Sequence, residues 1–220
     1  MNTIRKYRPT TLNDFVFPNE KVKREIYRYV DGKTSLPLVL HGPYGTGKST
    51  LAELIPIAID GPEVQVRRVK AEDLNNAASV RDELSRPEGY DRLFSYGNQR
   101  RGYTIIEEVN FDPKAKGAVR VSMDDMSDRE QYIFTTNEVE KIDKGILSRS
   151  MVLEVPAATP EVFFPKARQI MDAEGVDISD HSLTQVLQSS YAKKPDNREY
   201  YSAIDPIIEA HHDKPAKRSA

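Results

Sequence analysis

The sequence predicts an α/β fold in which a mostly parallel sheet of five strands is followed by a small domain made only of helices. Apolar runs alternate with helical patterns between residues 37 and 155, which is the order that βαβ units produce. A glycine-rich turn follows the first strand, and no strand pattern follows Pro156. We therefore expect an α/β domain at residues 1–157, a helical domain at 158–212 and a frayed basic tail at 213–220.

The first part of the chain predicts a helix, a buried strand and a second helix. Residues 1–20 look irregular, and Lys21–Val30 repeats apolar residues at the spacing of one helix face. Pro37–His41 is a short apolar run between turn-forming residues, as in a buried strand. A helix is expected from Lys48, and Pro56 predicts that this helix ends early or kinks.

Two patterns predict the remaining elements: alternating or continuous short apolar runs indicate strands, and apolar residues at helical spacing indicate helices. Strands are expected at Val64–Val69, Tyr103–Ile106, Tyr132–Phe134 and Met151–Val155. Helices are expected at Ala77–Leu84, Lys116–Met126, Pro160–Glu174, Ser179–Ser190 and Asn197–His211, with a loop at Pro87–Arg101.

Composition excludes several classes of protein. The 220 residues contain no cysteine, which excludes disulfides and cysteine-based zinc sites. We expect no membrane partner and a cytoplasmic or nucleoid-associated location, because the sequence shows neither a secretory signal nor a membrane-span pattern. The formal net charge of −2 decides little about nucleic acid, since affinity depends on local patches. Basic clusters occur at Arg67–Lys70, Arg100–Arg101 and Lys214–Arg218.

The turn after the first strand, Gly42–Ser49, fits the pattern G-x-x-x-x-G-K-S/T of phosphate-binding loops. Glycines let the backbone wrap round a phosphate, and its N–H groups donate to the anionic oxygens together with the next helix N-terminus. Lys48 can reach the β- and γ-phosphates, and the Ser49 hydroxyl can bind Mg²⁺. The expected nucleotide contacts are Gly42, Pro43, Tyr44, Gly45, Thr46, Gly47, Lys48, Ser49 and Thr50.

Two acidic residues follow the third predicted strand. Glu107 is expected to hold Mg²⁺ through water, and Glu108 to orient and polarise the attacking water. A strand that merely ends in solvated acids is the alternative. In ATPases with a phosphate-binding loop, the residue at the position of Glu107 is usually Asp. The extra methylene of Glu107 can displace the metal by about an ångström, and catalysis is sensitive to displacements on that scale. Hydrolysis is therefore less firmly predicted than binding.

Three further polar residues are candidates for contacts with the phosphates. Asn137 follows the fourth predicted strand, where it can touch the γ-phosphate or the attacking water; a turn-forming Asn is the alternative. Arg149 lies in a loop before the fifth strand, a position that suggests an arginine finger supplied to a neighbour's ATP. Arg198 opens the last helix and can lean over the phosphates, although an ordinary surface arginine fits equally well.

Together these strings resemble the AAA+ ATPase subunits of sliding-clamp loaders, such as replication factor C and phage loaders. Lys6–Val16 is similar to the N-terminal segment of that family, which implies that Tyr7, Arg8 and Val16 lie near the adenine. Gly42–Ser49 matches the family's Walker A motif, and Glu107 and Glu108 match its Walker B motif. Asn137 falls at the position called sensor 1 and Arg198 at sensor 2.

Two further strings extend the resemblance. Ala118–Met123 is similar to a family helix whose basic residue, here Arg120, couples neighbouring subunits or DNA. Ser148–Ser150 resembles the signature that carries the trans-acting arginine finger, with Ser150 in place of Cys. The likeness runs from about residue 5 to 210. Family members continue into a helical collar of roughly a hundred residues, a typical domain length, with no counterpart in the printed sequence.

The resemblance implies an AAA+ α/β core with a helical lid that binds ATP or ADP with Mg²⁺ and hydrolyses ATP. It implies AAA+ subunits, identical or different, as partners that complete the ATP site, with a sliding clamp and DNA as further partners in replication or repair. A helicase loader or a Holliday-junction motor is one alternative. Another is a nucleotide-binding assembly subunit with little turnover. The start of the helix at Ala77 and residues Lys114–Arg120 are candidate contacts with the DNA backbone.

Overall fold

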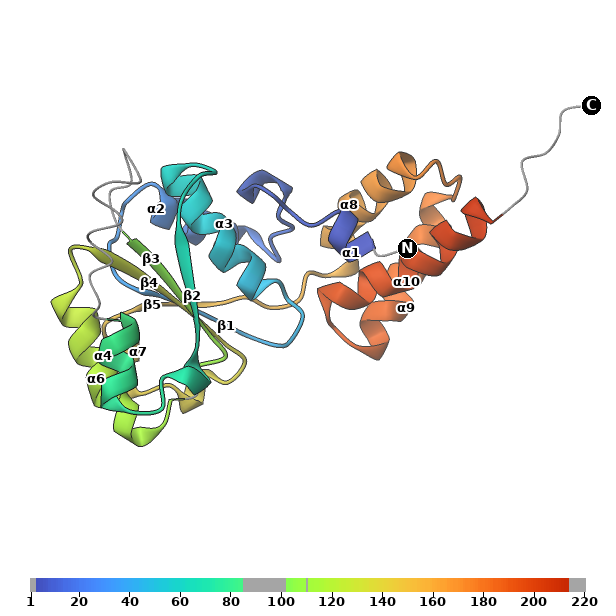
Figure 1. Ribbon diagram of the computed structural model, residues 1–220. Helices are drawn as coiled ribbons and strands as arrows, with labels where there is room; N and C mark the ends of the chain where they lie inside the picture. Colours follow the sequence, from blue (N-terminus) through green and yellow to red (C-terminus); the bar gives the residue numbers. More distant parts are fainter. Residues whose placement is uncertain (1–2, 85–101, 110, 214–220) are drawn as a thin grey trace, which may run out of the picture.

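The computed structural model describes residues 3–84, 102–109 and 111–213, which form a sheet-bearing part and a group of helices beside it (Figure 1). The predicted loop at Pro87–Arg101 and residues 214–220 of the predicted tail lie outside the described residues. One five-stranded sheet has the order β2-β3-β4-β1-β5, and its strand pairs are all parallel. The strands are β1 (Leu38–His41), β2 (Val66–Lys70), β3 (Gly102–Glu107), β4 (Glu130–Thr136) and β5 (Met151–Glu154).

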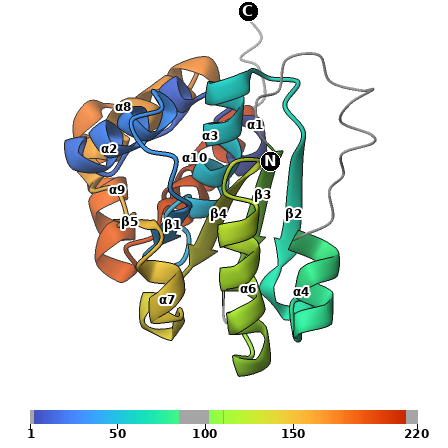
Figure 2. The ribbon, with the colours of Figure 1, turned by 90° about the vertical axis from the view of Figure 1, so that its left-hand side faces the viewer.

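Helices cover both faces of the sheet. In Figure 2, α2 and α3 lie on one face, and α4, α6 and α7 lie on the other. The helices of the sheet-bearing part are α2 (Glu20–Val30), α3 (Lys48–Asp60), α4 (Ala77–Leu84), α6 (Pro113–Asp125) and α7 (Lys144–Leu147), with short 3₁₀ turns at Leu12–Asp14, Ala71–Asp73 and Val139–Lys141. The group beside it consists of α8 (Pro160–Ala173), α9 (Asp180–Lys193) and α10 (Asn197–His212).

This architecture confirms the predicted fold class, a parallel α/β sheet followed by a helical lid. We call α8–α10 the helical lid. Among the described residues, no helix is both long enough and apolar enough to cross a lipid bilayer.

Two local expectations are wrong. Residues 1–20 are not irregular throughout, since they contain the helix α1 (Thr3–Lys6) and a 3₁₀ turn. The early end expected for α3 is also wrong, because α3 continues through Pro56 and ends at Asp60. Proline removes one helical hydrogen bond and crowds the preceding turn. Leu51, Ile55 and Pro56 itself are nevertheless buried, so burial of this face holds the helix together past the proline.

Three hydrophobic clusters hold the structure together. One lies between the sheet and the α4/α6 side, another between the sheet and the α2/α3 side, and the third lies inside the lid. The start of the chain belongs with the lid, because α1 (Thr3–Lys6) packs on α10 and the Thr3 backbone N–H donates to Asp205 at 3.2 Å. Tyr7 and Val16 pack against the cluster inside the lid. The segment before α2 therefore runs from the lid to the sheet-bearing part (Figure 1).

Three neighbouring strands of the sheet, β3, β4 and β1, have their carboxyl ends side by side, at what we call the carboxyl edge of the sheet. β1 lies between β4 and β5, and β4 lies between β3 and β1. Because the strands are parallel, His41, Glu107 and Thr136 end β1, β3 and β4 at the same edge. Ligands of open α/β sheets bind outside the carboxyl ends of the strands, which directs attention to this edge and to the lid beside it.

Candidate functional site

The loop from Gly42 to Ser49 leaves β1 and turns directly into α3. Its shape requires glycine at two positions. Gly42 has φ 138°, and an added Cβ would lie 2.5 Å from the Val155 carbonyl oxygen. Gly45 has φ 72°, and an added Cβ would overlap the carboxylate of Asp196 in the lid. Any side chain at either position would displace a neighbour, so the loop is packed tightly against both the lid and the residue that follows β5.

Lys48 is buried at the start of α3, and its ammonium group contacts the loop's own backbone. Lys48 Nζ donates to the carbonyl oxygen of Gly42 at 2.9 Å and to that of Pro43 at 2.6 Å. The pKa of Lys48 is lowered to about 8, chiefly by burial and also by the positive charge of Arg198, while the Asp196 carboxylate partly opposes the shift. A buried ammonium ion gains from an anionic partner, which makes this group ready to receive a phosphate.

A pocket of about 330 Å³ opens beside this loop, between the carboxyl edge of the sheet and the lid. Residues from the N-terminal segment, the loop, the ends of β3 and β4, and the lid line it. The predicted site residues in this lining are Arg8, Val16, Tyr44, Gly45, Gly47, Lys48, Ser49, Thr50, Glu108, Asn137 and Arg198.

Other predicted residues are not in this lining. Gly42 and Pro43 contribute the carbonyl groups that hold Lys48, and Thr46 is fully buried behind the loop. Within the described part of the chain, Tyr7, Glu107 and Arg149 are also outside the set that lines the pocket.

The lining also contains side chains that the sequence did not place at the site. Ile4, Pro9, Phe15, Phe163 and Tyr201 give one part of the pocket an apolar wall, in which the Phe163 and Tyr201 rings meet edge to face with centroids 5.3 Å apart. In the sequence, Phe163 and Tyr201 have the spacing of ordinary helix core residues. Only the position of the lid over the sheet edge brings them to the pocket. A flat heteroaromatic base would fit such an aromatic wall.

The N-terminal segment crosses between the lid and α3 next to the pocket. Tyr7 donates its hydroxyl hydrogen to Glu174 Oε1 at 2.6 Å, so the phenol is held by the lid. Lys6 and His212 contact the same buried carboxylate, and the hydrogen bonds from Lys6 and Tyr7 hold the pKa of Glu174 below its usual value.

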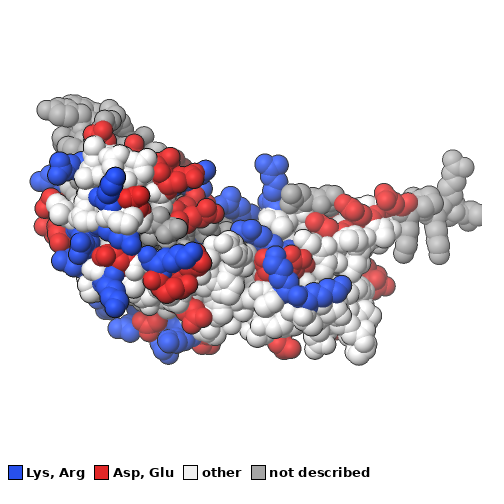
Figure 3. Space-filling view, turned by 90° about the horizontal axis from the view of Figure 1, so that it is seen from below, with Lys and Arg blue, Asp and Glu red and all other residues white. Residues whose placement is uncertain are grey.

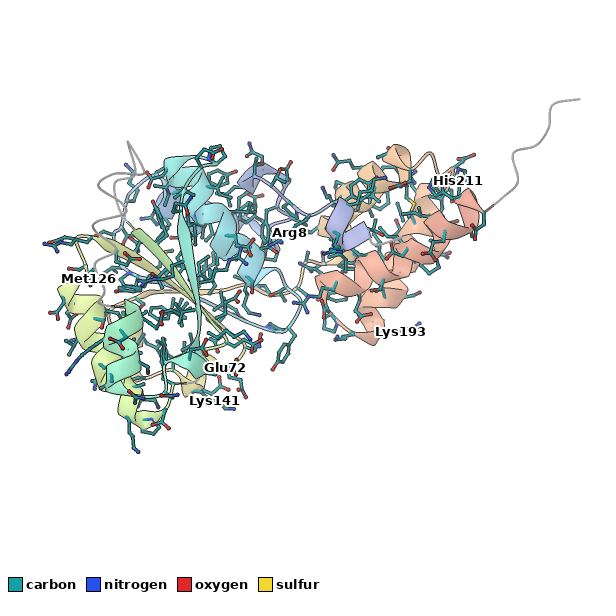
Figure 4. The ribbon with its side chains drawn as sticks, viewed as in Figure 1. Arg8, Glu72, Met126, Lys141, Lys193 and His211 are labelled. Carbon is teal, nitrogen blue, oxygen red and sulfur yellow. The ribbon has the colours of Figure 1, made fainter. Side chains whose placement is uncertain are left out.

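Arg8, the residue after Tyr7, contacts the sheet-bearing part instead of the lid. Arg8 pairs with Glu53 of α3, and Arg68 contacts the other oxygen of the same carboxylate at 2.7 Å. Figure 4 shows Arg8 at the junction between the sheet-bearing part and the lid. A single guanidinium group is thus placed both at the pocket and on the helix that follows the loop.

The two acidic residues after β3 have different surroundings. Glu107 is half-buried at the end of the strand, whereas Glu108 is exposed and lines the pocket. Glu108 has φ 53°, a left-handed conformation that is unfavourable for a residue with a Cβ. The next residue fixes this bend, because the Val109 N–H donates to the Thr135 carbonyl at 3.0 Å. Backbone strain of this kind is concentrated at functional sites.

Arg149 lies on a different surface of the sheet-bearing part. Its Nε donates to Asp124 at 3.0 Å, and its Nη1 donates to the Gly145 carbonyl at 3.0 Å. Together with Arg81 and Arg120 it borders a groove along α4 and α6. Arg149 therefore lies at the surface, where a second molecule can reach it, and not in its own chain's pocket.

The basic residues of β2 are balanced by acidic neighbours. Arg68 pairs with Glu53, Lys70 with Glu72 at 3.3 Å, and Arg67 lies 3.9 Å from Glu130. Figure 3 shows positive and negative side chains interspersed over the visible face of the sheet-bearing part. The Arg100–Arg101 and Lys214–Arg218 clusters lie outside the described residues.

Comparison with known proteins gives relatives along most of the chain. No protein-family model matches. The chain is 27% identical over 186 residues to replication factor C small subunit 2 of Pyrobaculum arsenaticum, covering 83% of this chain and 56% of the relative. It is 28% identical over 197 residues to replication factor C subunit 4 of Caenorhabditis elegans, covering 84% and 57%. The replication factor C small subunit of Natronomonas pharaonis is 28% identical over 204 residues, covering 91% and 60%.

Solved structures give the same fold. A substituted RuvB of Thermotoga maritima superposes with a TM-score of 0.68 at 18% identity, covering 89% of this chain and 64% of that one. A second RuvB structure from that organism gives a TM-score of 0.62 at 15% identity, with coverage of 91% and 73%. These likenesses show the fold alone.

The chain is therefore related to the AAA+ ATPases of the replication factor C small-subunit kind, over an α/β core and a helical lid. It spans little more than half the length of the curated relatives it matches.

Proposed function

We propose that this chain binds ATP with Mg²⁺ in the pocket between the sheet edge and the lid and hydrolyses it, as an AAA+ module of the clamp-loader kind in DNA replication or repair. The observation that carries the proposal is the composition of that pocket. Lys48, Ser49 and Thr50 come from the phosphate-binding loop and α3, Glu108 from the end of β3, Asn137 from the end of β4 and Arg198 from the lid.

These side chains divide naturally between binding and chemistry. The loop N–H groups and Lys48 would hold the β- and γ-phosphates, and the apolar wall of Phe15, Phe163 and Tyr201 would hold the base. Glu108 would orient and polarise the attacking water, with Asn137 beside it. Arg198 would neutralise charge on the terminal phosphates from the lid side.

The oxygen donors near the loop fit a magnesium ion that enters with the nucleotide. Mg²⁺ prefers oxygen ligands and is usually held by one or two protein groups together with substrate phosphates. Ser49 lines the pocket one residue after Lys48, and its hydroxyl would be the direct protein ligand. The Glu107 carboxylate is set back from the lining and would act through water. When bound, the ion would neutralise charge on the phosphate oxygens.

Nucleotide affinity should fall as the pH rises through the pKa of Lys48. The pKa of this ammonium is about 8 without nucleotide, and phosphate binding requires its charged form. From pH 7.5 to pH 9 the charged fraction drops, so we expect the Kd for ADP to rise about eightfold. Titration calorimetry at the two values measures the change. Lys48→Arg stays charged throughout and should show a flat profile, and an equally steep profile in that variant would contradict this origin.

The proposed assembly completes each ATP site with a neighbour. Arg149 lies at the surface beside the α4/α6 groove, so it would reach the γ-phosphate in an adjacent AAA+ subunit, identical or different. Loss of the γ-phosphate would then release the contact, as in other nucleotide switches. We propose a sliding clamp and primed DNA as the further partners, with Lys114–Arg120 near the DNA backbone.

The test is the ATPase rate of the chain with and without primed DNA and a sliding clamp. A clamp-loader module should be stimulated by both together, and its binding to primed DNA should weaken steeply between low and moderate salt. DNA affinity that is independent of salt would remove DNA from the proposal. Whether a larger collar-bearing subunit co-purifies with the chain is a useful second observation.

Two alternatives have tests of their own. For a Holliday-junction motor or a helicase loader, we expect stimulation by branched DNA without a clamp. The position of Glu107 behind the lining, with Glu in place of the usual Asp, favours a nucleotide-binding assembly subunit with little turnover. In that case ATP would bind and promote assembly while hydrolysis stayed negligible.

A further inference from the structure

The start of α10 contacts the phosphate-binding loop through two consecutive residues, and the residue after them lines the pocket. Asp196, which caps this helix by accepting the Arg198 N–H at 2.8 Å, packs its carboxylate against Gly45. Asn197 Nδ2 donates to the Thr46 carbonyl oxygen at 3.2 Å. Arg198 then enters the pocket lining. The lid is therefore hydrogen-bonded to the backbone of the loop itself.

The same Asn197 amide also holds the segment that connects the sheet to the lid. Asn197 Oδ1 accepts the Ala158 N–H at 2.9 Å, and the Ala158 carbonyl accepts the Tyr200 hydroxyl at 2.8 Å. Ala158 is fully buried, and both of its backbone groups are bound by side chains from one turn of α10. This connection cannot turn relative to α10 without breaking both bonds.

We propose that Asn197 is a positioning residue that makes the phosphate-binding loop, the connecting segment and the lid move as one unit. This inference rests on the proposed nucleotide binding. An amide has a donor and an acceptor on one planar group, so it can bond the Thr46 carbonyl and the Ala158 N–H at once. Aspartate retains only the acceptor, and leucine of similar size retains neither.

The bond to Thr46 suits a phosphate-binding loop. In such loops the N–H groups face the phosphates, so a donor that engages a carbonyl supports the loop without competing with the ligand. Asn197 therefore holds the loop ready for nucleotide and ties any adjustment of the loop to the angle of the lid. By linkage, if nucleotide binding favours one angle of the lid, then holding the lid at that angle raises nucleotide affinity by the same free energy.

Distances between two spin labels measure the lid directly. The chain has no cysteine, so Ser127→Cys on the sheet side and Ser189→Cys on α9 give two unique labelling positions at exposed serines. Without nucleotide, we expect Asn197→Leu and Asn197→Asp to broaden the distance distribution relative to the parent. Asn197→Asp decides which bond matters, because it keeps the acceptor for Ala158 and loses the donor to Thr46. Asn13→Asp, which makes the same change at an exposed asparagine that accepts from Tyr27, should leave the distribution unchanged.

Nucleotide affinity gives the second readout. Asn197→Leu loses both hydrogen bonds, and loss of the one to the phosphate-binding loop should raise the Kd for ADP and for a non-hydrolysable ATP analogue by about fivefold. Both nucleotides should be affected equally, because the loop holds phosphates that they share. Distances and affinities like those of the parent in both variants would overturn the inference. A parent chain that binds neither nucleotide would instead refute the proposed function, and the nucleotide-free distances would still decide the role of Asn197.

Discussion

Arg149→Ala should reduce ATP hydrolysis by the assembled protein by roughly 10³-fold or more, the scale known for arginine fingers, while ATP binding to the isolated chain stays unchanged. The physical reason is position. The guanidinium lies at the surface, held by Asp124 and the Gly145 carbonyl, and does not line its own chain's pocket. It can stabilise charge on a transferring phosphate only in a neighbour. Steady-state ATPase rates and calorimetric Kd values separate the two effects.

Mixing two inactive variants tests the action in trans. Arg149→Ala retains an intact pocket, and Lys48→Ala retains the finger but loses the ammonium that would hold the phosphates. A mixture should recover part of the ATPase rate, since some interfaces then combine a working pocket with a working finger. Arg81→Ala, which removes another arginine from the same groove, serves as the matched control and should remain active. An Arg149→Ala protein with the parent rate would remove the finger from the proposal.

Glu108→Gln should lower the ATPase rate by about 10²–10⁴-fold, the usual contribution of a general base, and leave ATP binding within about twofold. Glu108 lines the pocket at the end of β3, where its carboxylate can polarise water. Glutamine has the same shape and meets the same backbone strain at φ 53°, so the substitution changes charge and basicity alone. Single-turnover hydrolysis with bound ATP is the measurement.

Two further variants sharpen that result. Glu138→Gln changes a nearby exposed carboxylate that pairs with Lys141 and should leave the rate unchanged. Glu107→Gln should raise the Mg²⁺ concentration needed for half-maximal rate, whereas Glu108→Gln should not. If the parent and Glu108→Gln both bind ATP and both hydrolyse it negligibly, the protein is a nucleotide-binding assembly subunit instead of an ATPase.

The sequence determined the features that depend on local pattern. One continuous stretch of sequence contains the apolar strand before Gly42, the glycines of the loop and Lys48 at the start of α3. The parallel sheet follows from the alternation of strands and helices along the chain. Glu108 and Asn137 could be placed because parallel strands bring their carboxyl ends to one edge. The passage of α3 through Pro56 was missed, since burial outweighed the local preference.

The tertiary structure alone decided what the lid contributes. Phe163, Tyr201 and Asn197 reach the pocket from elements more than a hundred residues beyond the loop, and in the sequence they look like ordinary helix residues. Tyr7 was expected near the base, but its hydroxyl is bonded to Glu174 of the lid, and Tyr7 near adenine stays a prediction. The local pattern can specify a phosphate-binding loop because a few adjacent residues form it. The wall for the base and the contact between loop and lid depend on how the sheet-bearing part and the lid pack together, which no short stretch of sequence encodes.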